Sequence, residues 1–261
     1  MATFATTTNN PAFRAEAFPG YTQVFGHDGT AVRSNVMTVQ GTVGKTSLLL
    51  AILTATAIWS WTAATHNQVE PALFIGAGIG ALVLALVTIF KPTVAPWTAP
   101  VYAAFEGVVL GLISYLIEHS GIKGAYTGIA FQAVAMTLGV LLVMLFLYAS
   151  RTIVVTNRLR TGIIAAMGAL CLVYMVSFVL MLCGVEVPYL RNGSTLGIGI
   201  SLFVVGLAAF KLLLDFDFIE QAARRGAPKS MEWYGAFGLM LTLVWLYLEV
   251  LQLLRQFQDR R

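Results

Sequence analysis

The stretch KLLLDFDFIEQAARRGAPKSMEWYGAFGLMLTLVWLYLEVLQLLR, residues 211–255, decides the fold. Two apolar runs, each long enough to cross a bilayer, flank a basic loop in it. The runs carry four ionisable residues, Lys211, Asp215, Asp217 and Glu249. An ionisable group in hydrocarbon costs at least about 2.5–3.5 kcal/mol, so it normally faces a partner or a water-filled path. Function is therefore expected in this stretch.

The composition of the whole chain is that of an integral membrane protein. Of its 261 residues, 58% are hydrophobic and 11% are charged, whereas a soluble protein carries about 25% charged residues. The apolar runs lack the alternation of barrel strands. The net charge of +4 is therefore expected to concern loops and topology, with no role in binding nucleic acid. Cys171 and Cys183 share one apolar run and are predicted to be buried thiols.

Seven apolar runs predict an all-α bundle of seven transmembrane helices with short connections. The runs are 47–64, 72–90, 101–117, 125–149, 162–185, 196–219 and 233–254. Residues 1–44 are polar and are predicted to form a mobile cytoplasmic tail before a transmembrane domain of residues 45–261. Segment 91–100 holds three prolines and is predicted to be a turn, because proline removes a helix donor and clashes with the preceding turn.

Lysine and arginine set the expected topology. The side shared with the tail holds Arg14, Arg33, Lys45, Lys91, Arg151, Arg158, Arg160, Arg224, Arg225 and Lys229. The opposite loops hold only Lys123 and Arg191. The positive-inside rule then predicts a cytoplasmic N-terminus in a multi-pass cell-membrane protein. Seven crossings would place Arg255, Arg260 and Arg261 outside, against the rule, so the side of the C-terminus stays open.

The last two runs also suggest a family. Leu-Asp-Phe at 214–216, Ala-Pro-Lys at 227–229, Glu-Trp-Tyr at 232–234 and Thr-Leu-Val-Trp-Leu-Tyr-Leu-Glu at 242–249 resemble the Bax inhibitor-1 family. With Asn-Pro-Ala-Phe at 10–13, the chain is similar to that family's bacterial inner-membrane branch with a longer polar N-terminal tail. The resemblance implies a bundle whose seventh helix is enclosed by the other six. It also implies a pH-sensitive calcium leak gated by two acidic residues on the last two helices.

The resemblance assigns one of these two acidic residues and leaves the other open. Asp215 matches the family's aspartate near the end of helix six. Aligning Leu246-Tyr247-Leu248-Glu249 with the family's Leu-Tyr-Leu-Asp makes Glu249 the helix-seven partner. Aligning on the trailing residues 251–255 instead makes Thr242 the matching residue, which has no carboxylate.

Depth in the membrane favours a third arrangement. Asp215 lies roughly 7 Å from the cytoplasmic end of its helix and Glu249 roughly 24 Å from that end, at about 1.5 Å per residue. Those two carboxylates are therefore not expected to touch. Thr242 and Glu106, in the third run, are closer to the level of Asp215. We therefore predict that Glu106 is the second carboxylate and, with Asp215, a calcium ligand.

The remaining ionisable residues have narrower expected roles. Lys211 precedes Asp215 by one helical turn, a spacing at which side chains meet, so it is either a salt-bridge partner or a tethered counter-ion. Asp217 lies about 200° around the helix from Asp215 at 3.6 residues per turn, and either caps the helix end or takes part in gating. Glu249 either lines an outer vestibule or reaches the outer interface.

These residues favour a passive, pH-gated leak for calcium or other cations. Hard cations take oxygen ligands, and two nearby carboxylates in a low dielectric do not both ionise easily. A shared proton would hold the pair closed, and its loss would favour cation entry. The expected partners are the lipid bilayer, calcium ions and protons, with no cofactor. No nucleophile–base set, zinc spacing or phosphate loop is present, so an enzyme is not expected.

Two other functions fit the sequence. The chain could regulate a membrane protease or another membrane protein partner, with its tail as the contact. It could also be a proton-coupled transporter. Polar residues in the core favour conduction, whereas a tail indispensable for activity would favour the partner role.

Overall fold

Seven long α-helices make up the described part of the chain. The computed structural model describes residues 36–66, 71–119, 128–183 and 195–259. The helices are α1 (Val39–Thr65), α2 (Pro71–Phe90), α3 (Ala95–His119), α4 (Ile129–Ala149), α5 (Asn157–Leu182), α6 (Thr195–Arg224) and α7 (Met231–Asp259), with a 3-10 turn, η3 (Pro92–Val94), between α2 and α3. Each of the seven is long and apolar enough to cross a membrane. The predicted all-α class and seven spans are confirmed.

Helix α1 begins within the segment that was predicted as tail. Its first residue is Val39, and the Thr38 hydroxyl caps it by accepting from the Gly41 N–H at 3.0 Å. A threonine in this position satisfies one of the free N–H groups of the first turn. Residues 39–44 therefore belong to the bundle, and residues 1–35 of the predicted tail lie outside the described residues.

The prolines after α2 end that helix, but α3 begins earlier than predicted. Only Lys91 and η3 separate α2 from α3, and Pro100 lies inside α3. The prediction of a turn through residue 100 is therefore wrong beyond Val94. Pro96 falls in the first turn of α3, where an N–H has no helical partner. Pro100 costs α3 only the hydrogen bond to the Pro96 carbonyl.

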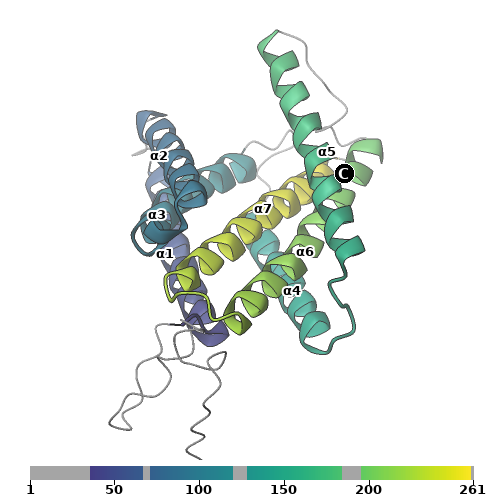
Figure 1. The fold of residues 1–261 in the computed structure, drawn as a ribbon. Coiled ribbons are helices and arrows are strands. Elements are labelled where there is room, and N and C mark those ends of the chain that lie inside the picture. The colour runs from purple at the N-terminus through teal and green to yellow at the C-terminus, as the bar shows by residue number, and fades with distance from the viewer. Residues whose placement is uncertain (1–35, 67–70, 120–127, 184–194, 260–261) are drawn as a thin grey trace, which may run out of the picture.

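Helix α7 is the element on which the bundle is packed. It runs antiparallel to α6, and α1, α3 and α4 pack on its other sides (Figure 1). Helix α2 packs on α3, and α5 packs on α6. The apolar segment of α7 is 50% buried, against 6% for α5. Four helices therefore form the main packing around α7, and its predicted enclosure by all six is not confirmed.

Two apolar cores flank α7. Leu246 and Leu251 are fully buried on one side, among side chains of α4 and α6. Phe237 and Met240 are buried on another side, among side chains of α1 and α3. The Phe237 ring meets the Tyr102 ring edge-on, with 5.2 Å between the ring centroids. These contacts fix α7 between two groups of helices.

The segment before α1 is attached to the loop between α6 and α7. The Met37 N–H donates to the Ala227 carbonyl at 2.7 Å, and Val36 forms an antiparallel bridge with Pro228. The Met37 side chain is 2% exposed. Residues 36 and 37 are therefore part of the folded domain.

A buried carboxylate links α1 and α7 beside this attachment. Glu232, in the first turn of α7, is 1% exposed. It accepts from the Thr38 N–H at 2.9 Å and from the Thr38 hydroxyl at 3.0 Å, and it forms an ion pair with Lys45 of α1. The Lys45 ammonium also lies 5.5 Å from the centre of the Trp233 ring. We call Thr38, Lys45 and Glu232 the α1–α7 clasp.

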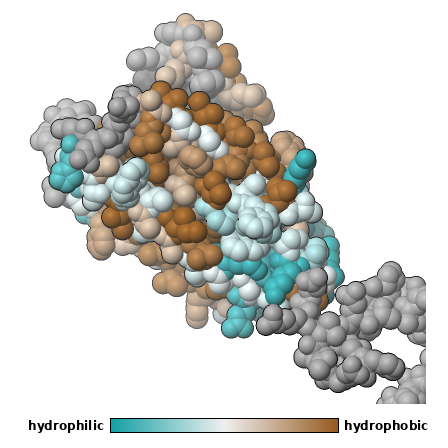
Figure 2. All heavy atoms as spheres, turned by 90° about the vertical axis from the view of Figure 1, so that its left-hand side faces the viewer, coloured by the Kyte–Doolittle hydropathy of each residue, from teal (hydrophilic) through white to brown (hydrophobic). Residues whose placement is uncertain are grey.

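The outer surface is apolar over most of the described helices. Figure 2 shows hydrophobic side chains across the middle of one face and hydrophilic ones gathered toward one end. Cys171 and Cys183 are both exposed free thiols, so the prediction that they are buried is wrong. They lie on α5 and at its C-terminal cap, and α5 turns most of its side chains outward because it packs mainly on α6 alone.

Helices α1 and α3 approach each other at two glycines. A Cβ on Gly107 would lie 2.3 Å from the Leu53 carbonyl oxygen, and one on Gly111 would lie 2.2 Å from the Ala57 carbonyl oxygen. Small residues four apart allow this close backbone contact. The Ser60 hydroxyl donates across the same interface to the Val108 carbonyl at 2.7 Å.

We expect Gly107→Ala to lower the thermal unfolding temperature of the purified protein in detergent. The added methyl group meets backbone atoms of α1, and overpacking typically costs about 1–3 kcal/mol. Gly139→Ala in α4 is the matched control, because a Cβ there has no neighbour within 4 Å and alanine is the better helix former. Equal unfolding temperatures for the two variants would contradict the close crossing.

Candidate functional site

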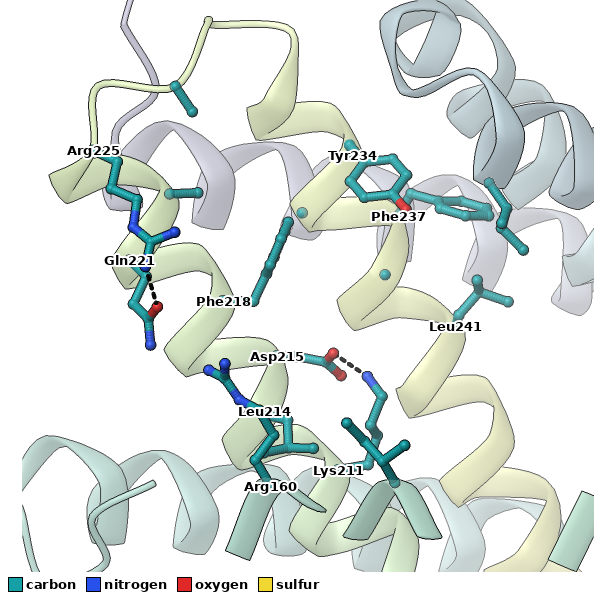
Figure 3. A pocket seen from close by; sticks show the side chains of 16 residues that line it. Arg160, Lys211, Leu214, Asp215, Phe218, Gln221, Arg225, Tyr234, Phe237 and Leu241 are labelled. Atoms are coloured by element: carbon teal, nitrogen blue, oxygen red, sulfur yellow. Dashed lines mark hydrogen bonds and ion pairs between the residues drawn. The ribbon is translucent and has the colours of Figure 1, made fainter. Parts of the chain in front are cut away.

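Asp215 lies between a cation of its own helix and a hydroxyl of α7. Its Oδ1 pairs with the Lys211 ammonium one turn earlier on α6, and its Oδ2 accepts from the Thr242 hydroxyl at 2.5 Å. Figure 3 shows the Lys211 and Asp215 side chains pointing toward each other beside α7. The Asp215 side chain is 13% exposed and that of Lys211 is 25% exposed. The predicted i,i+4 contact is confirmed.

This pair lines a cleft of about 690 Å³ between α6 and α7. Tyr234, Gly235 and Gly238 form its α7 side, and Arg160 of α5 and Ile89 of α2 also reach it. The space over Gly238 is open, because a Cβ there would meet nothing within 4 Å. The cleft therefore leads along α6 and α7 to Asp215.

Asp217 faces away from Asp215 and is paired separately. Its Oδ2 accepts from the Arg160 guanidinium at 2.5 Å and from the Gln221 amide at 2.7 Å. Arg160 and Gln221 line the large cleft, whereas Asp217 and Gln221 line a second cavity of about 150 Å³. The Arg160–Asp217 pair thus lies between the two spaces. Of the two roles expected for Asp217, this contact fits a structural role at the end of α6, because the pair links α5 to α6.

The second cavity is surrounded by charges at the end of α6. Glu220 pairs with Arg224 and, at 3.2 Å, with Arg151. It also accepts from the Tyr148 hydroxyl of α4. The Arg224 and Arg151 side chains are about two-thirds exposed, at 64% and 65%. This network joins α4 and the segment after it to α6, at the same end of the bundle as the α1–α7 clasp.

Glu106 does not lie beside Asp215. It is half-buried on α3, where it interacts with the hydroxyl of Tyr102, and α3 packs mainly on α1, α2 and α7. Neither carboxyl group has the other among its charged neighbours. The depth argument placed Thr242 correctly, but α7 separates α3 from α6. The structure therefore does not bring together the predicted Glu106–Asp215 pair.

Glu249 lies on α7, two turns beyond Thr242, and has partners of its own. It accepts from the Tyr174 hydroxyl of α5 and from the Trp245 indole N–H, each at 3.2 Å. The expectation that Glu249 and Asp215 do not touch agrees with these contacts. Of the two alignments that the family resemblance left open, the one that gives Thr242 matches the geometry.

The chemistry available at this site is that of one carboxylate, one hydroxyl and one tethered cation. Within the described residues, no three His, Cys, Asp or Glu side chains come close enough to hold a metal ion together. Asp215 and Thr242 offer oxygen ligands to a cation, and Lys211 competes for the same carboxylate. The arrangement can therefore exchange a protein cation for another cation or for a proton.

Sequence reasoning missed two of the residues that position this site. Arg160 was assigned to a cytoplasmic loop, but it belongs to the first turn of α5 and borders the cleft. Glu232 was quoted only as part of a motif, yet it holds α7 to Thr38 and Lys45. An acidic residue at the start of a long apolar helix was the available signal for Glu232. Arg160 had no local signal, because its partner is 57 residues away.

The fold and the site define a multi-pass helical membrane protein with charged side chains paired inside its bundle. A family model described as Bax inhibitor 1 like matches residues 6–259, so the chain belongs to that family. The resemblance seen in residues 211–255 is thereby confirmed. No curated protein and no solved structure matches the chain.

We expect Lys211→Met to destabilise the protein more at mildly alkaline pH than at mildly acidic pH. Removing one partner of a buried ion pair typically costs about 3–5 kcal/mol, and acid reduces that cost by protonating the lone Asp215. Thermal unfolding in detergent at the two pH values measures the effect. The double variant Lys211→Met/Asp215→Asn should recover most of the stability. A loss that is the same at both pH values and persists in the double variant would show that Lys211 acts elsewhere.

Proposed function

We propose that the protein is a passive, pH-dependent leak for calcium and other cations across the membrane, with Asp215 as its cation site. One observation carries this proposal. Asp215 and Lys211 form a charged pair within an apolar helix and line a cleft of about 690 Å³. Charged groups in such positions usually belong to ion or proton pathways. A role in catalysis has no comparable support among the described side chains.

In the proposed mechanism, Lys211 holds the site closed. Its ammonium group occupies the carboxylate that a permeating cation needs. A cation that arrives through the cleft replaces Lys211 at Asp215 and shares the Thr242 hydroxyl oxygen. The lysine side chain, four methylene groups long and partly exposed, can then turn into the cleft. Return of Lys211 releases the cation and closes the site again.

Protonation of Asp215 weakens the leak in this mechanism. The neutral carboxyl group is a poorer cation ligand, and it leaves the positive charge of Lys211 without a counter-charge in the path. Two further charged residues among the described ones line the cleft: Arg160 of α5, which Asp217 neutralises, and Arg225 near the α6–α7 loop. Cation flux should therefore rise as pH rises through the titration of Asp215 and fall in acid.

The orientation of the protein determines which compartment is sensed. We propose that the end of the bundle with the α6–α7 loop is cytoplasmic, because Lys45, Lys91, Arg151, Arg224 and Lys229 are all near that end. The cleft extends from Asp215 to Arg225 and Ala227, close to that loop. Asp215 would then equilibrate with cytoplasmic protons, so cytoplasmic acid would close the leak of a bacterial inner-membrane protein.

We expect Asp215→Asn to lower calcium flux and remove its pH dependence. The substitution keeps the shape of the side chain but deletes the titrating carboxylate. Proteoliposomes that contain only this protein and a trapped calcium indicator give the flux as a function of pH. Glu118→Gln, near the C-terminal end of α3, is the control and should behave as the wild type, because Glu118 does not line the cleft and a glutamine oxygen can still accept from the Gly128 N–H. An unchanged pH response in Asp215→Asn would place the site elsewhere.

We expect Thr242→Asp to move the pH midpoint of flux to higher pH. It sets a second carboxylate beside Asp215, and two like charges at that distance do not ionise together easily. Thr242→Val removes a hydroxyl that donates to the charged carboxylate but adds no charge, so it should move the midpoint in the same direction by a smaller amount. Glu106→Gln should leave the midpoint unchanged, because α7 lies between Glu106 and Asp215. A midpoint that moves in Glu106→Gln and not in Thr242→Asp would restore the pair predicted from depth.

A further inference from the structure

A polar face of α7 continues beyond Asp215 toward the C-terminal end of the helix. Thr242, Glu249, Gln252 and Gln256 lie within about 80° of one another around α7, at about 100° per residue. Trp245 lies in the same arc and donates its indole N–H to Glu249. We call these five residues the α7 polar track.

The track is the continuation of the cleft wall. Tyr234 and Gly238, which line the cleft, fall in the same arc of α7, in the two turns before Thr242. From Thr242 to Gln256 the helix rises about 21 Å, at about 1.5 Å per residue. The hydrocarbon core of a bilayer is about 30 Å thick. Cleft and track together therefore follow one face of α7 through most of a membrane.

The far end of the track contains buried amide groups without protein partners. Gln256 is 0% exposed, and neither its Oε1 nor its Nε2 has a hydrogen-bond partner in the described part of the chain. The Nε2 of Gln252 is also buried without a partner. Buried side-chain amides are almost always hydrogen-bonded, and those that protein groups leave unpaired are satisfied by water or an ion.

The opposite side of this part of α7 is apolar. Leu251 lies in the same part of α7, about 180° from Thr242 at about 100° per residue. It is also 0% exposed, and it packs in the apolar core with α4 and α6. The α7 surface is therefore apolar where it meets the core, and polar along the arc that leads away from Asp215.

We infer that the α7 polar track is hydrated and forms the second half of the cation path, from Asp215 to the C-terminal end of α7. This inference rests on the proposed leak function. The track suits a partly hydrated cation. Glu249 supplies its negative charge, Gln252 and Gln256 supply amide oxygens, and water completes the shell.

Cysteine accessibility tests the hydration of the track without any measurement of flux. The background is Cys171→Ser/Cys183→Ser, because both native thiols are exposed. Gln252→Cys and Gln256→Cys are reconstituted separately, with Leu251→Cys as the matched buried control. Each is treated on both sides of the membrane with a cationic methanethiosulfonate, the ethyltrimethylammonium reagent, which does not enter lipid.

We expect both glutamine positions to react at least about tenfold faster than Leu251→Cys, because thiol modification depends on access of water and reagent to the thiolate. The anionic ethylsulfonate reagent should react more slowly at Gln252→Cys, and adding Glu249→Gln should reduce that charge preference. If Gln252→Cys and Gln256→Cys are as protected as Leu251→Cys, the track is dry and the inference is overturned, even when the liposomes leak calcium. Labelled glutamine positions in liposomes that show no cation flux would instead support a hydrated track and overturn the leak function.

Discussion

A charge inside an apolar helix must be neutralised within the protein, and this constraint governs how the bundle is assembled. Even on the mildest scale an isolated charge in hydrocarbon costs about 2.5–3.5 kcal/mol. Asp215 has Lys211 and Thr242, Asp217 has Arg160 and Gln221, and Glu232 has Lys45 and Thr38. Several of these contacts also tie two helices together. The polar groups therefore fix which helices are neighbours, and the apolar side chains fill the space between them.

The fold was predictable because its signals are local. Seven apolar runs of sufficient length predict seven helices whatever their arrangement, and a lysine four residues before Asp215 predicts an ion pair on the same helix. The start of α1 was missed, because polar residues separate its cap, Thr38, from the first apolar run. Pro100 was misread, because local rules for proline do not include the packing that holds the start of α3 against α1, α2 and α7.

The site was predictable only in part, because its other contacts are distant in sequence. Depth along two helices placed Thr242 near Asp215 correctly. The same estimate of depth put Glu106 at that level. Depth does not determine on which side of α7 a helix lies, however. Lys45 and Glu232 are 187 residues apart and Arg160 and Asp217 are 57 apart. Their pairing follows from the order in which helices surround α7, which hydropathy and charge spacing do not determine.

A threonine beside Asp215 changes what the site can discriminate. In the proposed leak, a permeating ion has to displace the ammonium group of Lys211, which α6 holds one turn from Asp215. A monovalent ion offers Asp215 the same charge as Lys211, whereas a divalent ion doubles the Coulomb attraction at equal distance. Calcium and magnesium differ from each other as well. Magnesium gives up its water reluctantly and requires near-octahedral geometry, whereas calcium accepts six to eight oxygens in flexible arrangements. Asp215 and Thr242 supply few oxygens, so water must complete most of the shell. In the proposed leak, Lys211 therefore selects for divalent over monovalent charge, whereas the sparse oxygen set does not by itself favour calcium, because magnesium also binds through one or two carboxylates while it keeps several waters.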